Sequence, residues 1–262
     1  MRVAVLYICT GKYSVFFQDF YESCERFFLP GVEKTYFVWT DDLHLGDGLN
    51  RVKVQSRPCR GFPADSLFRF EMFLQVKEEL ERFDYIYFFN ANALFLQTVG
   101  EDILPDETGL AMGRWPGKRE HQHPMFYPYE RNRQSTAYIP PRRPPYIYYM
   151  GGLNGGTAPA YLEMIQTLNE NIHKDWSQNI VAYVYDESHI NRYLRDHPCK
   201  ILGAEFTTPE EFTRKHLDYD PKIIFRDKVR LDPYFNKGRD QSMFGRFKKG
   251  VRMVKRAVAW YL

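Results

Sequence analysis

The segment YIYFFNANALFLQ, residues 85–97, places two asparagines between two apolar stretches. Its first five residues are apolar or aromatic, which is typical of a strand buried on both faces. Asn90 and Asn92 follow at once. Side chains two residues apart on an extended segment point the same way, so this pair could hold a ligand at the edge of a sheet. Asparagine also favours turns, so the pair could simply end the strand.

Strands and helices alternate on both sides of this segment. Continuous apolar runs predict buried strands at Val3–Ile8 and Lys34–Thr40. Helices are expected over Ser14–Phe28, with Ser14 as the cap, and over Ala64–Phe83. This alternation is typical of an α/β domain with a mixed, largely parallel sheet. Ligands bind such sheets beyond the carboxyl ends of the strands, where the segment CTGKY (residues 9–13) and the asparagine pair would meet.

The composition is that of an ordered globular protein. Charged residues make up 26% of the 262 residues and aromatic residues 17%, enough for a sizeable core. The four cysteines include no C-x-x-C pair, which gives no zinc spacing and favours a reducing compartment. No apolar run reaches the roughly 18 residues of a membrane span. We therefore expect a cytoplasmic protein.

The positive charge is concentrated in the last residues of the chain. Residues 246–262 hold six basic side chains and no acidic one, which leaves 30 basic against 33 acidic side chains elsewhere. A domain with that balance is not expected to bind nucleic acid. Over residues 241–262 the pattern predicts a basic amphipathic helix, suited to peripheral contact with an anionic inner membrane surface. The alternative is a helix packed on the body of the protein. The apolar stripe comprises Phe247, Val251, Val254, Val258 and Tyr261, and the basic side comprises Lys248, Lys249, Arg252, Lys255 and Arg256.

Four segments in order resemble glycosyltransferase family 6, the family of the blood-group A and B enzymes. They are KTYFVWTD (34–41), YERNRQSTAYIP (129–140), YYMGGLNGGT (148–157) and DESHINRYL (186–194), and the resemblance covers about residues 1–230. It implies the GT-A type α/β fold, with a catalytic domain over 1–240. Residues 1–97 would form its UDP-binding half and residues 98–240 its acceptor-binding half. It also implies retaining transfer of galactose or GalNAc from UDP to a sugar 3-hydroxyl.

The sequence departs from the animal members of that family at its opening motif. Those members carry Asp-x-Asp, which binds Mn²⁺, where this chain has Asn90-Ala91-Asn92. Neutral amides are weak ligands for a hard divalent cation, so we expect no metal and no other cofactor. Positive charge for the leaving UDP must then come from basic side chains. The candidates are Arg69 and Lys228, the latter within a cluster that also holds Arg226 and Arg230. For Arg69 the alternative is a surface ion pair with Glu71 or Glu78, and for the cluster it is a solvated charged face.

Asp186 and Glu187 stand at the expected start of a helix. The simple interpretation is that Asp186 caps the helix and Glu187 interacts favourably with its dipole. The resemblance implies in addition that Glu187 is catalytic, as a nucleophile or as a stabiliser of an oxocarbenium-like state. Asp186 would hold the donor sugar. Tyr185 replaces a histidine of the animal members at a position implied to contact the acceptor.

The remaining candidate residues also follow from the resemblance. Tyr13 would stack on uracil with Thr10 nearby, and Met150, Gly151 and Gly152 would line the donor sugar. Glycine at 152 favours GalNAc, although glycines in a strand can also reflect close packing. Trp115 is a candidate for stacking on the acceptor.

Together these features predict a metal-independent enzyme that transfers GalNAc from UDP-GalNAc to a fucosylated galactoside. The first alternative is an α-1,3-galactosyltransferase that uses UDP-galactose. The second is an inactive relative that only binds sugar nucleotides.

Overall fold

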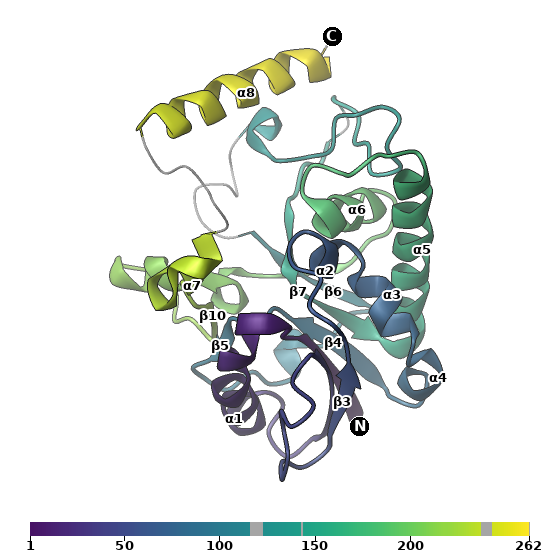
Figure 1. Ribbon diagram of the computed structural model, residues 1–262, viewed down its shortest axis with the longest axis vertical. Helices are drawn as coiled ribbons and strands as arrows, with labels where there is room; N and C mark the ends of the chain where they lie inside the picture. The colour runs from purple at the N-terminus through teal and green to yellow at the C-terminus, as the bar shows by residue number, and fades with distance from the viewer. Residues whose placement is uncertain (116–122, 143, 237–242, 262) are drawn as a thin grey trace.

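The computed structural model of the chain describes residues 1–115, 123–142, 144–236 and 243–261 (Figure 1). Its centre is a seven-stranded sheet of order β3-β2-β1-β4-β7-β6-β8. Strands β3, β2, β1 and β4 are parallel, β7 is antiparallel to both its neighbours, and β8 is parallel to β6. The predicted mixed, largely parallel α/β fold is confirmed. The strands are β1 (Arg2–Ile8), β2 (Glu33–Thr40), β3 (Val52–Ser56), β4 (Tyr85–Phe89), β6 (Leu110–Arg114), β7 (Tyr149–Thr157) and β8 (Lys200–Leu202).

A second sheet of three short strands lies beside the first. Its order is β5-β10-β9, with β5 antiparallel and β9 parallel to β10. Because β5 directly follows the turn after β4, this small sheet joins the middle of the chain to residues beyond 207. The strands are β5 (Ala93–Phe95), β9 (Thr208–Pro209) and β10 (Ile223–Phe225).

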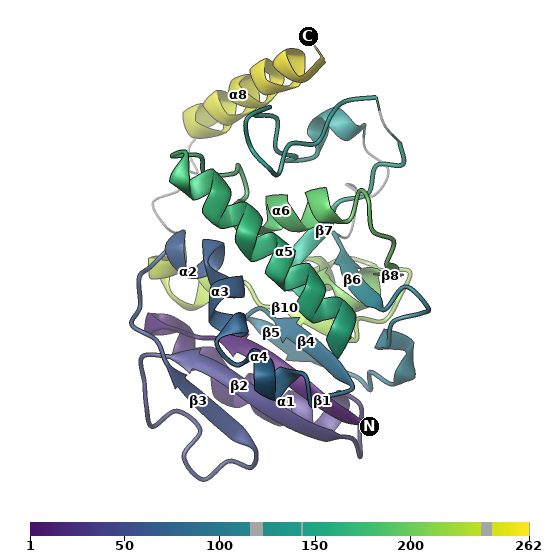
Figure 2. The same ribbon diagram turned by 90° about the vertical axis from the view of Figure 1, so that its right-hand side faces the viewer.

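Helices cover both faces of the large sheet. Figure 2 shows α5 crossing one face and α1 on the other. Strand β1 alternates between the two cores accordingly: Val3, Val5 and Tyr7 pack on the α1 side, whereas Ala4 and Leu6 pack on the α5 side. The helices are α1 (Phe17–Phe27), α2 (Ala64–Leu67), α3 (Arg69–Leu74), α4 (Lys77–Leu80), α5 (Ala158–Ser177), α6 (Tyr185–Tyr193), α7 (Lys228–Leu231) and α8 (Met243–Tyr261).

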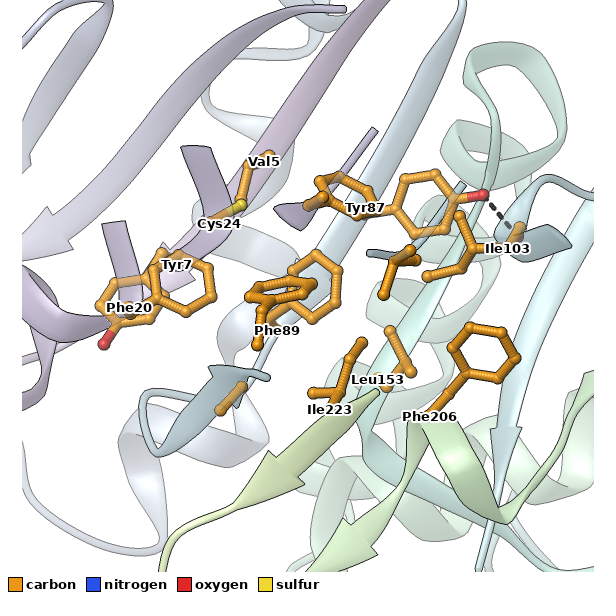
Figure 3. Close-up of a cluster of buried hydrophobic side chains, with 14 of the residues drawn as sticks. Val5, Tyr7, Phe20, Cys24, Tyr87, Phe89, Ile103, Leu153, Phe206 and Ile223 are labelled. Carbon is orange, nitrogen blue, oxygen red and sulfur yellow. Dashed lines mark hydrogen bonds between the residues drawn. The ribbon is translucent and has the colours of Figure 1, made fainter. Parts of the chain in front are cut away.

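The core under α1 is largely aromatic (Figure 3). The rings of Tyr7 and Phe20 stack with their centroids 4.3 Å apart. The buried hydroxyl of Tyr87 donates to the Ile103 carbonyl at 2.8 Å, so its polar end is satisfied. This packing fixes β1 and β4, whose carboxyl ends carry the candidate site.

Two helices differ from the sequence predictions. The segment 64–83 is not one helix but α2, α3 and α4, with breaks at Phe68 and Val76. Phe68 and Arg69 are both buried, so the segment turns more of its surface inward than a single amphipathic helix allows. Ser14 caps no helix: its hydroxyl donates to the Gly11 carbonyl within the 3₁₀-helix η1 (Gly11–Phe16), and α1 begins only at Phe17.

The C-terminal helix α8 packs on the body of the protein through one face. Ala257 and Trp260 are buried, and the Trp260 indole donates to the Ile139 carbonyl at 2.6 Å. The many basic side chains of the tail favour a helix that does not pack on the body of the protein, but the burial of Trp260 shows that α8 does pack on it. Val251, Val254 and Val258, on another face, remain 40%, 54% and 53% exposed. The side chains of Phe247, Lys248, Lys249 and Arg252 lie outside those described. Within the described residues, no helix has the length and apolar character needed to cross a membrane.

Candidate active site

A cavity of about 630 Å³ lies beyond the carboxyl ends of β1 and β4. Its lining comes from η1, α3, the turn after β4, β7, the start of α6 and α7. Segments from both ends of the chain therefore meet at the sheet edge where a ligand was expected. Of the predicted site residues, those lining the cavity are Thr10, Tyr13, Arg69, Asn90, Gly151, Gly152, Tyr185, Asp186, Glu187 and Lys228.

Three predicted site residues do not line this cavity: Asn92, Met150 and Trp115. Asn92 was expected to point the same way as Asn90, but the chain is not extended here. The Ala93 amide donates to the Asn90 carbonyl at 2.9 Å and closes a turn. The side-chain amide of Asn92 instead donates to the Arg226 carbonyl at 2.7 Å. Asn90 thus faces the cavity, while Asn92 ties the turn to the end of β10.

This arrangement does not suit a hard divalent cation at the asparagine pair. The two side chains diverge, and the side-chain Oδ1 of Asn92 is buried with no hydrogen-bond partner. The donor set consists of neutral amides, which bind such ions weakly. Across the described part of the chain, no group of three or more His, Cys, Asp and Glu side chains could hold a metal ion.

Glu187 lies in the first turn of α6, and each of its carboxylate oxygens accepts a hydrogen bond from β7 or from the residue just before it. The Gly151 amide donates to Oε2 at 2.6 Å, and the Tyr148 hydroxyl donates to Oε1. Asn191, one turn later, accepts from the Tyr149 amide at 2.9 Å and donates to the Tyr149 and Glu187 carbonyls. Because Asn191 locks α6 to the start of β7, the Glu187 carboxylate has a fixed place at the cavity wall.

Arg69 and Asp186 form a buried ion pair beside Glu187. Arg69 also donates to the Gly151 carbonyl at 2.7 Å and lies over the ring of Phe88, 4.5 Å from its centroid. Burial lowers the pKa of Arg69 to about 10, and the nearby Tyr161 and Glu187 oppose that shift. The surface alternative for Arg69 is wrong, since its partner is Asp186.

The four glycines of β7 serve two purposes. A Cβ on Gly151 would lie 2.8 Å from the Arg69 guanidinium and 3.3 Å from the Asp186 carboxylate, so only glycine fits beside the ion pair. A Cβ on Gly152 would meet the flexible end of Met150 at 2.8 Å. Gly155 and Gly156 instead face the Tyr87 ring and the Gly109 carbonyl. Close packing explains the second pair, whereas the first pair borders the cavity.

The end of the cavity opposite Glu187 is lined by η1 and its approach, by Asp65 of α2 and by Lys228 of α7. The Thr10 hydroxyl donates to Asp65 at 3.0 Å, and the Lys228 ammonium lies 5.2 Å from the centroid of the Tyr13 ring. Arg226, grouped with Lys228 in the sequence, forms an ion pair with Asp19 at 2.6 Å and does not line the cavity. Lys228 is therefore the member of that cluster that lines the cavity.

Sequence reasoning missed several cavity residues. Asp65 accepts from Thr10 and from the Gly61 amide at 2.9 Å, yet in the sequence it reads as an ordinary acid at a helix start. Phe62 lines the mouth and packs edge-on against Tyr185, with centroids 4.7 Å apart. Outside the cavity lining, Tyr148 was missed as well: it is one of 19 tyrosines, and nothing in its neighbours marks it as a partner of Glu187.

Comparison with known proteins shows the family of the chain. The model of glycosyltransferase family 6 matches residues 1–218. The chain belongs to glycosyltransferase family 6. The resemblance seen in the sequence is thus confirmed, and with it a glycosyltransferase that uses a nucleotide-sugar donor and a glycan acceptor.

Relatives in family 6 come from bacteria and animals. The chain is 34% identical over 238 residues to the O-antigen biosynthesis glycosyltransferase WbnI of Escherichia coli, covering 90% of this chain and 99% of that protein. It is 32% identical over 205 residues to the rat histo-blood group ABO system transferase 1, covering 74% and 57%. It is 28% identical over 223 residues to the human globoside alpha-1,3-N-acetylgalactosaminyltransferase 1, covering 79% and 60%. The chain therefore spans less than two thirds of the length of these rat and human relatives.

Proposed function

We propose that this protein is a retaining α-1,3-glycosyltransferase that moves GalNAc from UDP-GalNAc to a fucosylated galactoside. The observation that carries the proposal is the Glu187 carboxylate, fixed at the cavity wall by the Gly151 amide and the Tyr148 hydroxyl. The human relative is named as an α-1,3-N-acetylgalactosaminyltransferase and the rat relative as an ABO transferase. The name of the human relative supports the sugar and the linkage proposed for this chain.

In the proposed reaction the bond between the anomeric carbon and the β-phosphate oxygen of UDP breaks. The 3-hydroxyl oxygen of the acceptor bonds to that carbon on the same face, and its proton passes to the leaving diphosphate. Glu187 either bonds transiently to the anomeric carbon or stabilises its positive charge. We propose that Asp186, which pairs with Arg69 and lines the cavity, accepts hydrogen bonds from donor-sugar hydroxyls.

Basic side chains would take the role that a metal ion has in the animal relatives. Arg69 is already balanced by Asp186, so its charge is not available in full to the diphosphate. Among the described residues that line the cavity, Lys228 is the other basic side chain. We propose that its ammonium group stabilises the leaving diphosphate.

A donor screen tests this function. UDP-GalNAc and UDP-galactose are each offered with a fucosylated galactoside, with EDTA or with Mn²⁺, and product is separated by chromatography. We expect transfer from UDP-GalNAc at a rate that EDTA does not reduce and Mn²⁺ does not raise. Transfer from UDP-galactose alone would support the galactosyltransferase alternative. Binding of UDP without any transfer would support the inactive relative, and loss of activity on chelation would refute metal independence.

We also propose that the exposed face of α8 contacts an anionic membrane surface on the cytoplasmic side. Val251, Val254 and Val258 form an exposed apolar stripe, and Lys255 beside them is exposed. Each basic residue near such a surface contributes about 1 kcal/mol, and apolar burial adds to it. Since Trp260 is buried, truncation of the helix is a poor test.

Replacing the three valines together with serine removes the stripe without touching the packed face. The full chain should sediment with phosphatidylglycerol vesicles at low salt, and the triple variant should not. An unchanged melting temperature would show that the variant is folded. Failure of the unaltered protein to bind these vesicles at low salt would refute the membrane contact.

A further inference from the structure

Tyr148 touches the candidate catalytic residue from outside the cavity. It lies one residue before β7 and is buried, and its hydroxyl donates to Oε1 of Glu187. It is not part of the cavity lining. Glu187 also accepts a hydrogen bond from the Gly151 amide, a backbone group that no side-chain substitution removes. Tyr148 is therefore a side chain through which the sequence can set the orientation of this carboxylate.

The ring of Tyr148 is held in place by other aromatic rings. Tyr127 stacks on it with centroids 5.9 Å apart and planes 13° apart, and Tyr129 lies at 5.7 Å. The Tyr129 hydroxyl donates to the Ile147 carbonyl at 2.6 Å, which fixes the backbone just before Tyr148. Trp260 of α8 packs behind Tyr129 at 6.3 Å. With its ring packed in this way, Tyr148 can present its hydroxyl at one fixed position.

We propose that Tyr148 is a positioning residue for glycosyl transfer, whose hydroxyl holds the Glu187 carboxylate in its reactive orientation. Two donors on two different oxygens prevent the carboxylate from rotating about its terminal bond. Without the hydroxyl, Oε1 loses this hydrogen bond and the carboxylate is freer to turn away from the anomeric carbon. Misplacement of a reacting group lowers turnover more than binding, because the ground state makes few contacts that depend on it. This inference rests on the proposed role of Glu187.

The variant Tyr148→Phe removes the hydroxyl and keeps the ring. Initial rates at varied donor concentration should show kcat lowered roughly 10- to 100-fold, as expected for loss of one hydrogen bond to a charged group. The donor KM should change little, and so should the dissociation constant of UDP measured by calorimetry. A raised KM with unchanged kcat would overturn the proposal, because it would show that Tyr148 only shapes the binding site.

Tyr87→Phe is the matched control. Its hydroxyl is also buried and donates to a backbone carbonyl, but it lies in the core under α1 (Figure 3). It should lower the melting temperature without a selective loss of kcat. An equal fall of kcat in Tyr87→Phe and Tyr148→Phe would indicate a general effect of removing a buried hydroxyl and would overturn the proposal.

A double-mutant cycle ties the effect to Glu187. If Tyr148 acts through that carboxylate, adding Tyr148→Phe to Glu187→Gln should lower kcat little further. A full additional loss would mean that Tyr148 acts elsewhere, and the proposal would be wrong. The cycle also separates the two hypotheses. An inactive Glu187→Gln with a normal Tyr148→Phe refutes only the positioning role, whereas normal turnover in Glu187→Gln refutes both.

Discussion

The two ends of the cavity are held together in different ways. At the Glu187 end the charged side chains are buried: those of Arg69 and Asp186 are 7% and 4% exposed. At the Lys228 end the chain is held partly by surface contacts, such as the ion pair of Lys12 with Asp232 at 2.6 Å, whose side chains are 54% and 36% exposed. A buried pair is costly to break, whereas an exposed pair contributes little to stability. We therefore expect substitutions at the first end to affect chemistry and folding, and those at the second to affect mainly donor binding.

The largest effect is expected from Glu187→Gln. This change keeps the shape of the side chain and can keep the bond from the Gly151 amide, but it removes the negative charge. Losing a positioned nucleophile or ion stabiliser should lower kcat on the order of 10²–10⁴-fold. Single-turnover and steady-state rates measure it, with thermal melting as the folding control. Near-normal turnover with a lowered melting temperature would show that Glu187 acts only at the start of the helix.

The next effect is on stability at the same end. Arg69→Met leaves Asp186 buried without its partner, which should cost about 3–5 kcal/mol of unfolding free energy. Denaturant unfolding followed by fluorescence gives the value. Arg82→Met, the same change at an exposed arginine just after α4, is the control and should change it by less than about 0.5 kcal/mol. A loss of similar size in both variants would mean that the ion pair does not stabilise this end.

The sequence predicts only part of the Glu187 end of the cavity. The strands follow from continuous apolar runs, and the start of α6 follows from Asp186 and Glu187. The prediction that Asp186 caps this helix is wrong, because the N-cap position is Val184 and Asp186 lies within the first turn. The partner of Arg69 does not follow, because nearby Glu71 competes for it in the sequence, and only the fold brings Asp186 from 117 residues away. Contacts across such separations have no local signal.

The asparagine pair and α8 show the same limit. Periodicity predicts that the side chains of Asn90 and Asn92 share a side. Instead, the hydrogen bond from the Ala93 amide to the Asn90 carbonyl closes a turn, and the Asn92 side chain donates to the Arg226 carbonyl. Likewise, the sequence predicts an amphipathic α8, yet which face packs is decided by Trp260 reaching the Ile139 carbonyl. In both cases the tertiary partner overrides a correct local pattern.

At the other end, Lys228→Met should weaken donor binding without destabilising the fold. Loss of one charge-assisted contact with the diphosphate should raise the donor KM and the dissociation constant of UDP roughly 10- to 100-fold. The unfolding free energy should change by less than about 0.5 kcal/mol. Arg230→Met, a change of the same kind on the same short helix but outside the cavity lining, is the control. Equal UDP affinity in the two variants would contradict a role for Lys228 at the diphosphate.

The smallest effect is expected where β7 passes from the cavity into the core. Gly152→Ala adds a methyl that would meet the mobile end of Met150 at 2.8 Å and the Phe225 ring at 3.2 Å, so the site can yield in part. We expect the added bulk to crowd an N-acetyl group and shift the preference toward UDP-galactose by about 10-fold, the lower end of what one methyl achieves. Competition between the two donors measures the ratio.

Gly155→Ala is the matched control on the same strand: its methyl would lie 2.3 Å from the Tyr87 ring and 2.7 Å from a backbone carbonyl, neither of which can move freely. That variant should lose stability with an unchanged donor ratio. If Gly152→Ala also leaves the ratio unchanged, position 152 does not contact the sugar, and the choice of GalNAc must be set elsewhere in the cavity.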